Sequence, residues 1–196
     1  MALFTGKGDK GTTGLFSRKG GQASGLGCDQ RVSKSSAIAE ALGSLDEINS
    51  FLGLIKVKAK ESELRVTSQE LRMDEIVNEI QQNLFIIQAE VAGADKTINE
   101  EKLREVESLI NTIEKELPPI KSFFVSGGTE LASLFDIART MARRAERRVT
   151  AVIENEDRKV GEWTRSYLNR LSSILYALAR LSNHKSGIKE QPPTYR

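Results

Sequence analysis

The sequence predicts an all-α fold: an up-and-down five-helix bundle with a long glycine-rich N-terminal loop. Two observations carry this prediction. From Ser36 onward the apolar residues recur every three or four positions, which is the spacing of one face of an α-helix. No segment sustains an alternation of apolar and polar residues, so an extended sheet is not expected. Short connections between long helices favour antiparallel packing, which produces a bundle.

Five apolar runs predict the five helices. In chain order the runs are Leu42, Leu45, Ile48, Leu52 and Ile55; Ile76, Ile80, Leu84, Ile87 and Val91; Leu103, Val106, Ile110, Ile113 and Leu117; Leu131, Leu134, Ala138, Met141, Ala145 and Val149; and Leu168, Leu171, Leu175, Leu178 and Leu181. Pro118 and Pro119 should end the third helix, because proline has no amide hydrogen and its ring clashes with the preceding turn. Gly127 and Gly128 should form the turn before the fourth helix. The highly charged segment 56–72 should contain a helix end, a loop and the next helix start.

The chain is expected to form a single domain, as is usual for about 100 to 200 residues. Within 1–196 we expect a loop region at 1–36, a helical bundle at 37–184 and a flexible tail at 185–196. Eight of the 15 glycines lie within residues 6–27, which favours a loop over a packed core in that region.

The composition excludes several classes of protein. Twenty-nine basic residues against 27 acidic ones leave a net charge of +2, too small to indicate binding to nucleic acid or to an anionic membrane. Cys28 and His184 are the sole residues of their types, so one chain can build neither a disulfide nor a Cys/His zinc site. No run of about 18 apolar residues and no signal-peptide pattern occurs, so we expect a cytoplasmic protein in a reducing compartment, without membrane contact.

The N-terminal string from Thr5 to Thr13 has the composition of a polyphosphate-binding loop. It packs three glycines, three threonines and two lysines into nine positions. Glycines let backbone amides approach an anion, hydroxyls donate to it and lysines offset its charge. A plain flexible loop is the alternative, and the Walker pattern is absent. A further lysine, Lys34, lies in a serine-rich segment before the first helix, where simple helix capping would explain the serines equally well.

Arg139, Arg143 and Arg147 recur every fourth residue and should line one face of the fourth helix. Three like charges in a row destabilise a helix unless carboxylates or a bound anion offset them, and Glu146 supplies one carboxylate near Arg143. The alternative interpretation is a solvated basic face. Alanines beside the arginines would let another helix or a subunit pack closely.

Two further polar positions are candidates for contacts outside their own helix. In the first helix, Asp46 lies away from the leucines and isoleucines and is free to pair elsewhere. In the last helix, Asn169 belongs to a polar stripe opposite the leucines. That stripe either faces solvent or contacts a nucleotide.

Taken in order and spacing, these strings resemble the PduO-type ATP:corrinoid adenosyltransferases. That family carries Thr-x-x-Gly-Asp-x-Gly, then Val-Ser-Lys, then Gly-x-x-Asp-Glu-x-Asn, which stand here at 5–11, 32–34 and 43–49. The resemblance continues through 123–128, through the Ala-Arg-Thr-x-x-Arg-Arg-Ala-Glu-Arg run at 138–147, and through 167–172. The six strings run along the length of the chain.

The resemblance implies an enzyme that transfers the 5′-deoxyadenosyl group of ATP to the cobalt of cob(I)alamin, itself made by reduction of cob(II)alamin, with release of triphosphate. It also implies a five-helix bundle that assembles as a homotrimer, with active sites at subunit interfaces. Mg²⁺ would be bound together with ATP. An electron donor such as a flavoprotein reductase, and hand-off of the product to a B12-dependent enzyme, are the implied partners.

The resemblance also assigns roles to residues. Those implied to bind the nucleotide are Thr5, Gly6, Lys7, Gly8, Asp9, Gly11, Thr12, Thr13, Lys34, Arg143, Arg144, Glu146, Arg147 and Asn169. Asp46 would pair with Arg139 of the partner subunit. Phe123 matches the family aromatic that lies beneath the corrin and keeps the lower axial ligand from cobalt, which eases the reduction of cobalt(II).

Three features depart from the family pattern. The segment from Ser35 to Ile38 lacks the Asp, Pro and Arg common there, Ser126 stands where proline is common, and 18–30 is an extended insertion. These departures are expected to affect the affinity for the ligands more than the type of reaction.

Two other functions stay open on the residues alone. One is an ATP-dependent phosphoryl transferase, which would use the same loop and arginines. The other is a non-enzymatic helical interaction module whose arginine stripe binds RNA or an acidic protein. The lack of aromatic residues interleaved with the stripe weighs against nucleic acid.

Overall fold

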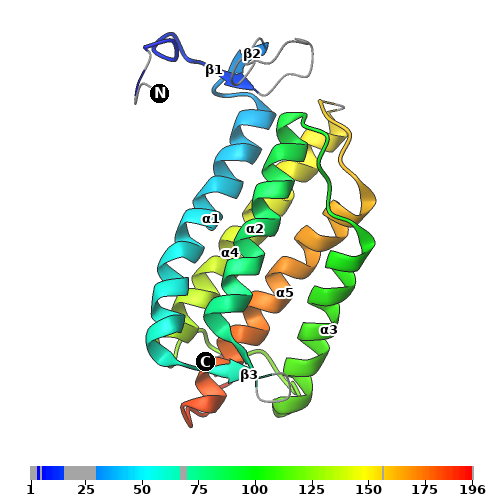
Figure 1. Ribbon diagram of the computed structural model, residues 1–196. Coiled ribbons are helices and arrows are strands. Elements are labelled where there is room, and N and C mark those ends of the chain that lie inside the picture. Colours follow the sequence, from blue (N-terminus) through cyan, green and yellow to red (C-terminus); the bar gives the residue numbers. More distant parts are fainter. Residues whose placement is uncertain (1–3, 5, 16–29, 67–69, 156, 196) are drawn as a thin grey trace.

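A computed structural model describes residues 4, 6–15, 30–66, 70–155 and 157–195 (Figure 1). Within these ranges five helices form the body of the molecule, which confirms the predicted number and order of helices. They are α1 (Ala37–Ser62), α2 (Met73–Ala92), α3 (Glu100–Glu116), α4 (Glu130–Glu154) and α5 (Glu162–Lys185). None of the described helices is long and apolar enough to cross a membrane.

Two short antiparallel hairpins accompany the helices. Strand β1 (Thr12–Leu15) pairs with β2 (Gln30–Ser33), and β3 (Arg65–Val66) pairs with β4 (Leu71–Arg72). The first hairpin lies in the region 1–36, for which the sequence predicts a loop, and the second lies in the segment 56–72, for which the sequence predicts no strand. Strands of four and two residues are too short to show the period-two alternation that marks a strand in sequence. The insertion at 18–30 lies outside the described residues except for Gln30.

Helix boundaries follow local side-chain chemistry. The hydroxyl groups of Ser36 and Thr129 and the side-chain oxygen of Asn99 accept hydrogen bonds from the first turns of α1, α4 and α3, at 3.0 to 3.3 Å. Such caps satisfy backbone amides that have no partner within the helix. As predicted, α3 ends at Glu116, just before Pro118.

The core depends on close contact between α4 and its neighbours. On α4, Ala138, Ala142 and Ala145 have no exposed surface, and α1 and α5 pack on this face. Larger side chains, such as Phe135 of α4 and Tyr167 of α5, are also fully buried. The prediction that alanines on the fourth helix allow close packing is confirmed within the chain.

Ion pairs show that α1 and α4 run in opposite directions. Glu40 near the start of α1 lies 3.8 Å from Arg148 near the end of α4, and Lys58 near the end of α1 lies 3.6 Å from Glu130 at the start of α4. The β1–β2 hairpin therefore lies at the end of the bundle where α4 finishes, and α4 begins at the opposite end (Figure 1).

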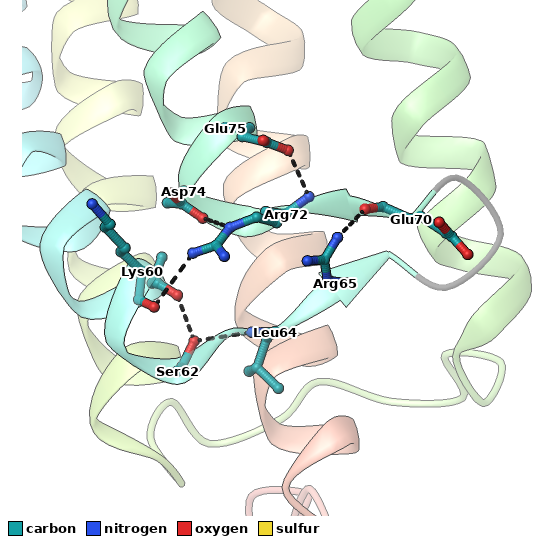
Figure 2. A network of polar contacts seen from close by, with 9 residues as sticks. Lys60, Ser62, Leu64, Arg65, Glu70, Arg72, Asp74 and Glu75 are labelled. Carbon is teal, nitrogen blue, oxygen red and sulfur yellow. Dashed lines mark hydrogen bonds and ion pairs between the residues drawn. The ribbon is translucent and has the colours of Figure 1, made fainter.

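A polar network reverses the chain between α1 and α2 (Figure 2). Arg72 is its centre: its guanidinium donates to Asp74 at 2.8 Å, and its backbone amide donates to Glu75 at 3.1 Å. On the other strand, Arg65 donates to the carbonyl oxygen of Glu70 at 2.8 Å. The charges of this segment thus serve the turn that connects two helices.

A second network ties the end of α2 to the start of α5. The Glu90 carboxylate accepts hydrogen bonds from the Gly161 amide at 2.8 Å, from the Thr97 hydroxyl at 3.1 Å and from the Thr164 hydroxyl. One side chain therefore fixes three segments that are distant in sequence.

Replacing Glu90 with Gln should destabilise the fold, because an amide NH₂ cannot accept the hydrogen bonds that the lost oxygen accepted. We expect the free energy of unfolding to fall by about 1–3 kcal/mol. Urea denaturation followed by circular dichroism would measure it. The control Glu114→Gln, an exposed change on α3, should shift stability by less than about 0.5 kcal/mol. Equal effects of the two changes would contradict the role assigned to Glu90.

Candidate active site

A cavity of about 680 Å³ lies where the segment between α3 and α4 meets α4 and α5. It brings together three residues that the sequence singled out, Phe123, Arg139 and Arg143. Its other polar walls include Asp136 and Tyr176. A pocket of this size with a mostly apolar lining and a few charged groups is typical of a ligand site.

Phe123 is unusual because four fifths of its side chain is exposed. Ile120 and Val125 on the same segment are also more than half exposed. A monomeric protein gains nothing from exposing several large apolar side chains together, so such a patch beside a cavity indicates a binding surface.

The segment that carries Phe123 is held by two residues that the sequence analysis missed. Arg180 is 4% exposed. Its guanidinium donates hydrogen bonds to Glu190 in the tail and, at 3.0 Å, to the Pro118 carbonyl oxygen. The guanidinium also lies 5.3 Å from the ring centre of Phe124. The sequence signal that could have identified Arg180 is its charge within the leucine-rich face of the last helix, next to Leu181.

Asn183 closes the same segment from the other side. Its side-chain oxygen accepts from the Thr129 amide at 2.9 Å, and its NH₂ donates to the Gly127 carbonyl at 2.8 Å. The tail also takes part, since the Val125 amide donates to the carbonyl oxygen of Gln191 at 2.9 Å. These contacts anchor tail residues 190 and 191, whereas flexibility of the rest of the tail stays a prediction.

The arginines of α4 divide into two groups. Arg144 and Arg148 pair with Glu47 and Glu40 of α1 and so support the packing of the bundle. Arg143 and Arg147 are exposed and make no ion pair within the described part of the chain. Carboxylates therefore offset the charges of Arg144 and Arg148, whereas Arg143 and Arg147 have no such carboxylate among the described residues. Unpaired arginines in a row are expected of an anion site.

Arg139 is the third member of the predicted stripe. Its guanidinium donates to Asp136 one turn earlier at 3.1 Å and lies 6.0 Å from the ring centre of Tyr176. Partial burial raises the pKa of the Tyr176 hydroxyl, so this group stays protonated at neutral pH. Asp46 is exposed on α1 and makes no ion pair among the described residues.

The structure brings Glu146 and Asn169 together. The Asn169 NH₂ donates to the Glu146 carboxylate at 2.9 Å, and Arg170 donates to the side-chain oxygen of Asn169 at 2.6 Å. The polar stripe on α5 is thus connected to the arginine helix.

The N-terminal string folds back against β2. Backbone hydrogen bonds join Asp9 to Gly6 and Gly11 to Gly8, and a Cβ on Gly8 would lie 3.3 Å from the amino group of Lys34. Arg31, which the sequence analysis did not select, donates to the Lys7 carbonyl at 2.6 Å and to both oxygens of Thr12. Thr13 lies in β1 opposite Val32. Thr5 lies outside the described residues.

The two parts of the predicted active site, here called half-sites, are the N-terminal string and the segment around Phe123, and they do not meet within one chain. The N-terminal string lies before the start of α1. The segment between α3 and α4, which carries Phe123, lies at the other end of the bundle, where the antiparallel α4 begins (Figure 1). Helix α1 alone has 26 residues, a length of about 39 Å. Within one chain the N-terminal string and Phe123 therefore lie far apart.

Comparison with known proteins shows similarity over most of the chain. A family profile described as Cobalamin adenosyltransferase matches residues 3–182. The chain is 37% identical over 195 residues to the corrinoid adenosyltransferase of Bacillus subtilis, covering 96% of this chain and 90% of that protein. It is 37% identical over 191 residues to the corrinoid adenosyltransferase PduO of Citrobacter freundii, covering 94% of this chain and 50% of the relative. The chain therefore spans about half the length of that longer relative.

Solved structures show the same fold. A variant PduO-type ATP:corrinoid adenosyltransferase from Lactobacillus reuteri, complexed with cobalamin and ATP, superposes with a TM-score of 0.81 at 27% identity, covering 99% of this chain and 97% of that one. A second variant, complexed with ATP, gives a TM-score of 0.79 at 27% identity, covering 99% and 100% of the two chains.

Replacing Gly128 with Ala should distort the turn below Phe123. Its φ is +111°, and a Cβ there would lie 2.3 Å from the side-chain oxygen of Asn183. We expect a loss of about 1–3 kcal/mol in the free energy of unfolding, measurable by denaturant titration. Ser126→Ala, an exposed change in the same turn, is the matched control and should cost less than about 0.5 kcal/mol. An unchanged stability of Gly128→Ala would mean that Asn183 does not hold the turn.

Proposed function

Because this chain belongs to the cobalamin adenosyltransferase family, we propose that it transfers the 5′-deoxyadenosyl group of ATP to the cobalt of cob(I)alamin and releases triphosphate. The observation that carries the proposal beyond the family match is the cavity that joins an exposed aromatic ring, Phe123, to an unpaired arginine, Arg143. The flat face of a corrin ring could pack on Phe123, and the negative charge of ATP could be offset by Arg143.

The corrinoid is proposed to lie against the exposed apolar segment. Phe123 offers a flat apolar surface and no atom that could ligate cobalt. Held under the corrin, it would keep the lower axial ligand away, which makes cobalt(II) easier to reduce. The buried anchors Arg180 and Asn183 then act as positioning residues for this ring.

The nucleotide is proposed to bind between subunits. Gly6, Lys7, Gly8, Thr13 and Lys34 would surround the triphosphate, with Asp9, Gly11, Thr12 and Thr5 completing the loop, while Arg143, Arg144, Glu146, Arg147 and Asn169 would contact the nucleotide from α4 and α5. The separation of the two half-sites within one chain supports this arrangement, and a closed homotrimer would supply three such sites.

Asp46 and Arg139 are proposed to pair across the subunit interface. Asp46 projects from α1 without a partner in the described part of its own chain. Arg139 has one local carboxylate, and its guanidinium has donors left for a second one.

The reaction is an in-line displacement. The reduced cobalt attacks the 5′ carbon of ATP, a cobalt–carbon bond forms, and the bond from that carbon to the triphosphate oxygen breaks. Negative charge develops on the departing triphosphate, so lysine and arginine side chains such as Lys34 and Arg143 stabilise the transition state without acting as acids.

Mg²⁺ is proposed to arrive with ATP. Among the residues that the structure describes, no three His, Cys, Asp or Glu side chains gather into a metal site. Mg²⁺ is commonly held by substrate phosphates and water with only one or two protein oxygens, so a single nearby side chain, such as Asp9, is compatible with the ion. Bound to ATP, the ion would offset charge on the leaving group.

The setting of the enzyme follows from its chemistry. Cob(I)alamin has to be produced by an electron donor, for which a flavoprotein reductase is suited, and the product serves B12-dependent enzymes that could receive it directly. A reducing, cytoplasmic compartment would suit the reactive cobalt. A phosphoryl transferase would yield ADP in place of triphosphate, so the phosphate product decides between the two reactions.

Anaerobic incubation with chemically reduced cob(I)alamin and Mg-ATP should produce the adenosylcobalamin spectrum with one triphosphate per turnover. Arg143→Ala should lower kcat/KM roughly 10- to 100-fold, which corresponds to the loss of a charge-assisted contact of about 1.5–3 kcal/mol. Arg165→Ala, which removes an exposed arginine of α5, is the control and should retain activity. Full activity of Arg143→Ala would overturn its assignment, and ADP as the product would overturn the proposed reaction.

Asp46→Asn should weaken assembly and turnover together, because a partly buried Arg139 would lose its partner across the interface. We expect about 3 kcal/mol less favourable subunit association, seen as dissociation at low concentration in analytical ultracentrifugation. Glu154→Gln, an exposed change at the end of α4, should leave assembly as it is. If both variants assemble like the parent chain, the pair does not form.

A further inference from the structure

A second cavity lies on the opposite side of α5, between α2 and α3. Its volume is about 850 Å³, and it shares no lining residue with the cavity below Phe123. Helix α3 packs mainly on α5, which leaves the space between α3 and α2 open. This size suits one small organic ligand.

The cavity has an apolar floor and an acidic rim. Ile76, Ile80 and Ile174 are buried side chains of the floor. Five carboxylates but only two cationic side chains line the walls. Both cations are already paired, Lys102 with Glu79 and Arg104 with Glu100.

Of the three other carboxylates, Glu75 accepts a hydrogen bond from the Arg72 backbone amide, and the remaining two have no hydrogen-bond or ion-pair partner in the described part of the chain. Glu101 and Glu105 are exposed, lie one turn apart on α3, and make no ion pair with any residue that the structure describes. Their charges favour a cation at the mouth of the cavity and disfavour ATP, which is an anion.

A buried polar pair lies on the inner wall. Asn83 is 3% exposed and Tyr167 is 1% exposed; the Asn83 NH₂ donates to the Tyr167 hydroxyl at 3.1 Å. The side-chain oxygen of Asn83 has no hydrogen-bond partner among the described atoms. Turning the amide over would pair the oxygen and leave the NH₂ unpaired, so either orientation leaves one buried polar group without a hydrogen-bond partner among the described atoms.

The hydroxyl of Tyr167 adds a donor. Burial raises its pKa well above the usual range, so the proton stays on the oxygen at neutral pH. A buried polar pair that is incompletely satisfied needs a polar partner from water or from a ligand.

The ion pair between the two walls decides what kind of ligand fits. Lys102 of α3 lies 2.9 Å from Glu79 of α2 and bridges the opening. A helix from another protein could not lie in the groove without breaking this pair. A small molecule can enter beside it.

We propose that this cavity is a ligand site for a small cationic amphiphile, a molecule with an aromatic or alkyl body and an ammonium group. The body lies on the isoleucine floor, the ammonium faces Glu101 and Glu105, and a polar hydrogen or acceptor of the body meets the Asn83–Tyr167 pair. The site is separate from the proposed adenosyl transfer, and its failure would leave that proposal untouched.

Three indoles of matched shape test the proposal: tryptamine carries an ammonium, tryptophol a hydroxyl and indole-3-acetate a carboxylate. Each is titrated into the methyl-labelled 196-residue chain saturated with Mg-ATP, and methyl resonances are followed by NMR. Tryptamine should bind saturably, with shifts centred on Ile76, Ile80 and Ile174. It should bind about fivefold more tightly than tryptophol, and indole-3-acetate should bind most weakly.

Variants separate the contributions of shape and charge. Leu109→Trp fills the cavity and should abolish tryptamine binding, while Glu101→Gln with Glu105→Gln should remove the preference for tryptamine over tryptophol. Glu114→Gln changes an α3 carboxylate away from the cavity and should alter neither. Equal affinity of all three indoles, shifts centred on the cavity below Phe123, or no saturable binding of tryptamine to the parent protein would each overturn the proposal.

Discussion

The close approach of α1 and α5 to α4 is the constraint on which the remaining structure depends. It is possible because one face of α4 carries alanines at the contact positions, with no exposed surface at Ala138, Ala142 and Ala145. Small side chains let helix backbones approach, and interdigitated neighbours then exclude water. The other face of the same helix is left for arginines. A single element therefore serves as the centre of the core and as a wall of the candidate active site.

The candidate site combines a firmly held backbone with exposed side chains that can contact a ligand. Arg180 and Asn183 are almost fully buried and satisfy backbone carbonyls and an amide of the segment above them. That support lets Phe123 project an apolar ring toward the cavity and solvent without the segment collapsing onto the core. Arg143 and Arg147, on an element fixed by its alanines, are likewise exposed without a counter-charge among the described residues. Because the backbone beneath these groups is already held, only the side chains have to be ordered when a ligand binds.

The helices could be predicted from the sequence because each contains several turns of regular apolar spacing, as in Ile76 to Val91. The hairpins could not, because strands of two to four residues carry no period. The family strings pointed to Phe123 and Arg143, and the structure brings these two together. Arg180 and Asn183 were missed because their partners, Pro118 and Gly127, are more than fifty residues away in sequence, and only the fold brings them together. The separation of the two half-sites is also a property of the fold, since periodicity does not reveal which end of a helix a loop reaches.

The pairing of Arg180 with Glu190 has a consequence for how the protein matures. Glu190 follows Phe123 by 67 residues, and α4 and α5 lie between them. On the ribosome, the aromatic segment is synthesised long before the guanidinium beneath it and before the carboxylate that neutralises that guanidinium. The segment around Phe123 therefore cannot gain its full support until Glu190 has been made, and a chain that ended before Glu190 would leave the Arg180 guanidinium beneath that segment without its carboxylate.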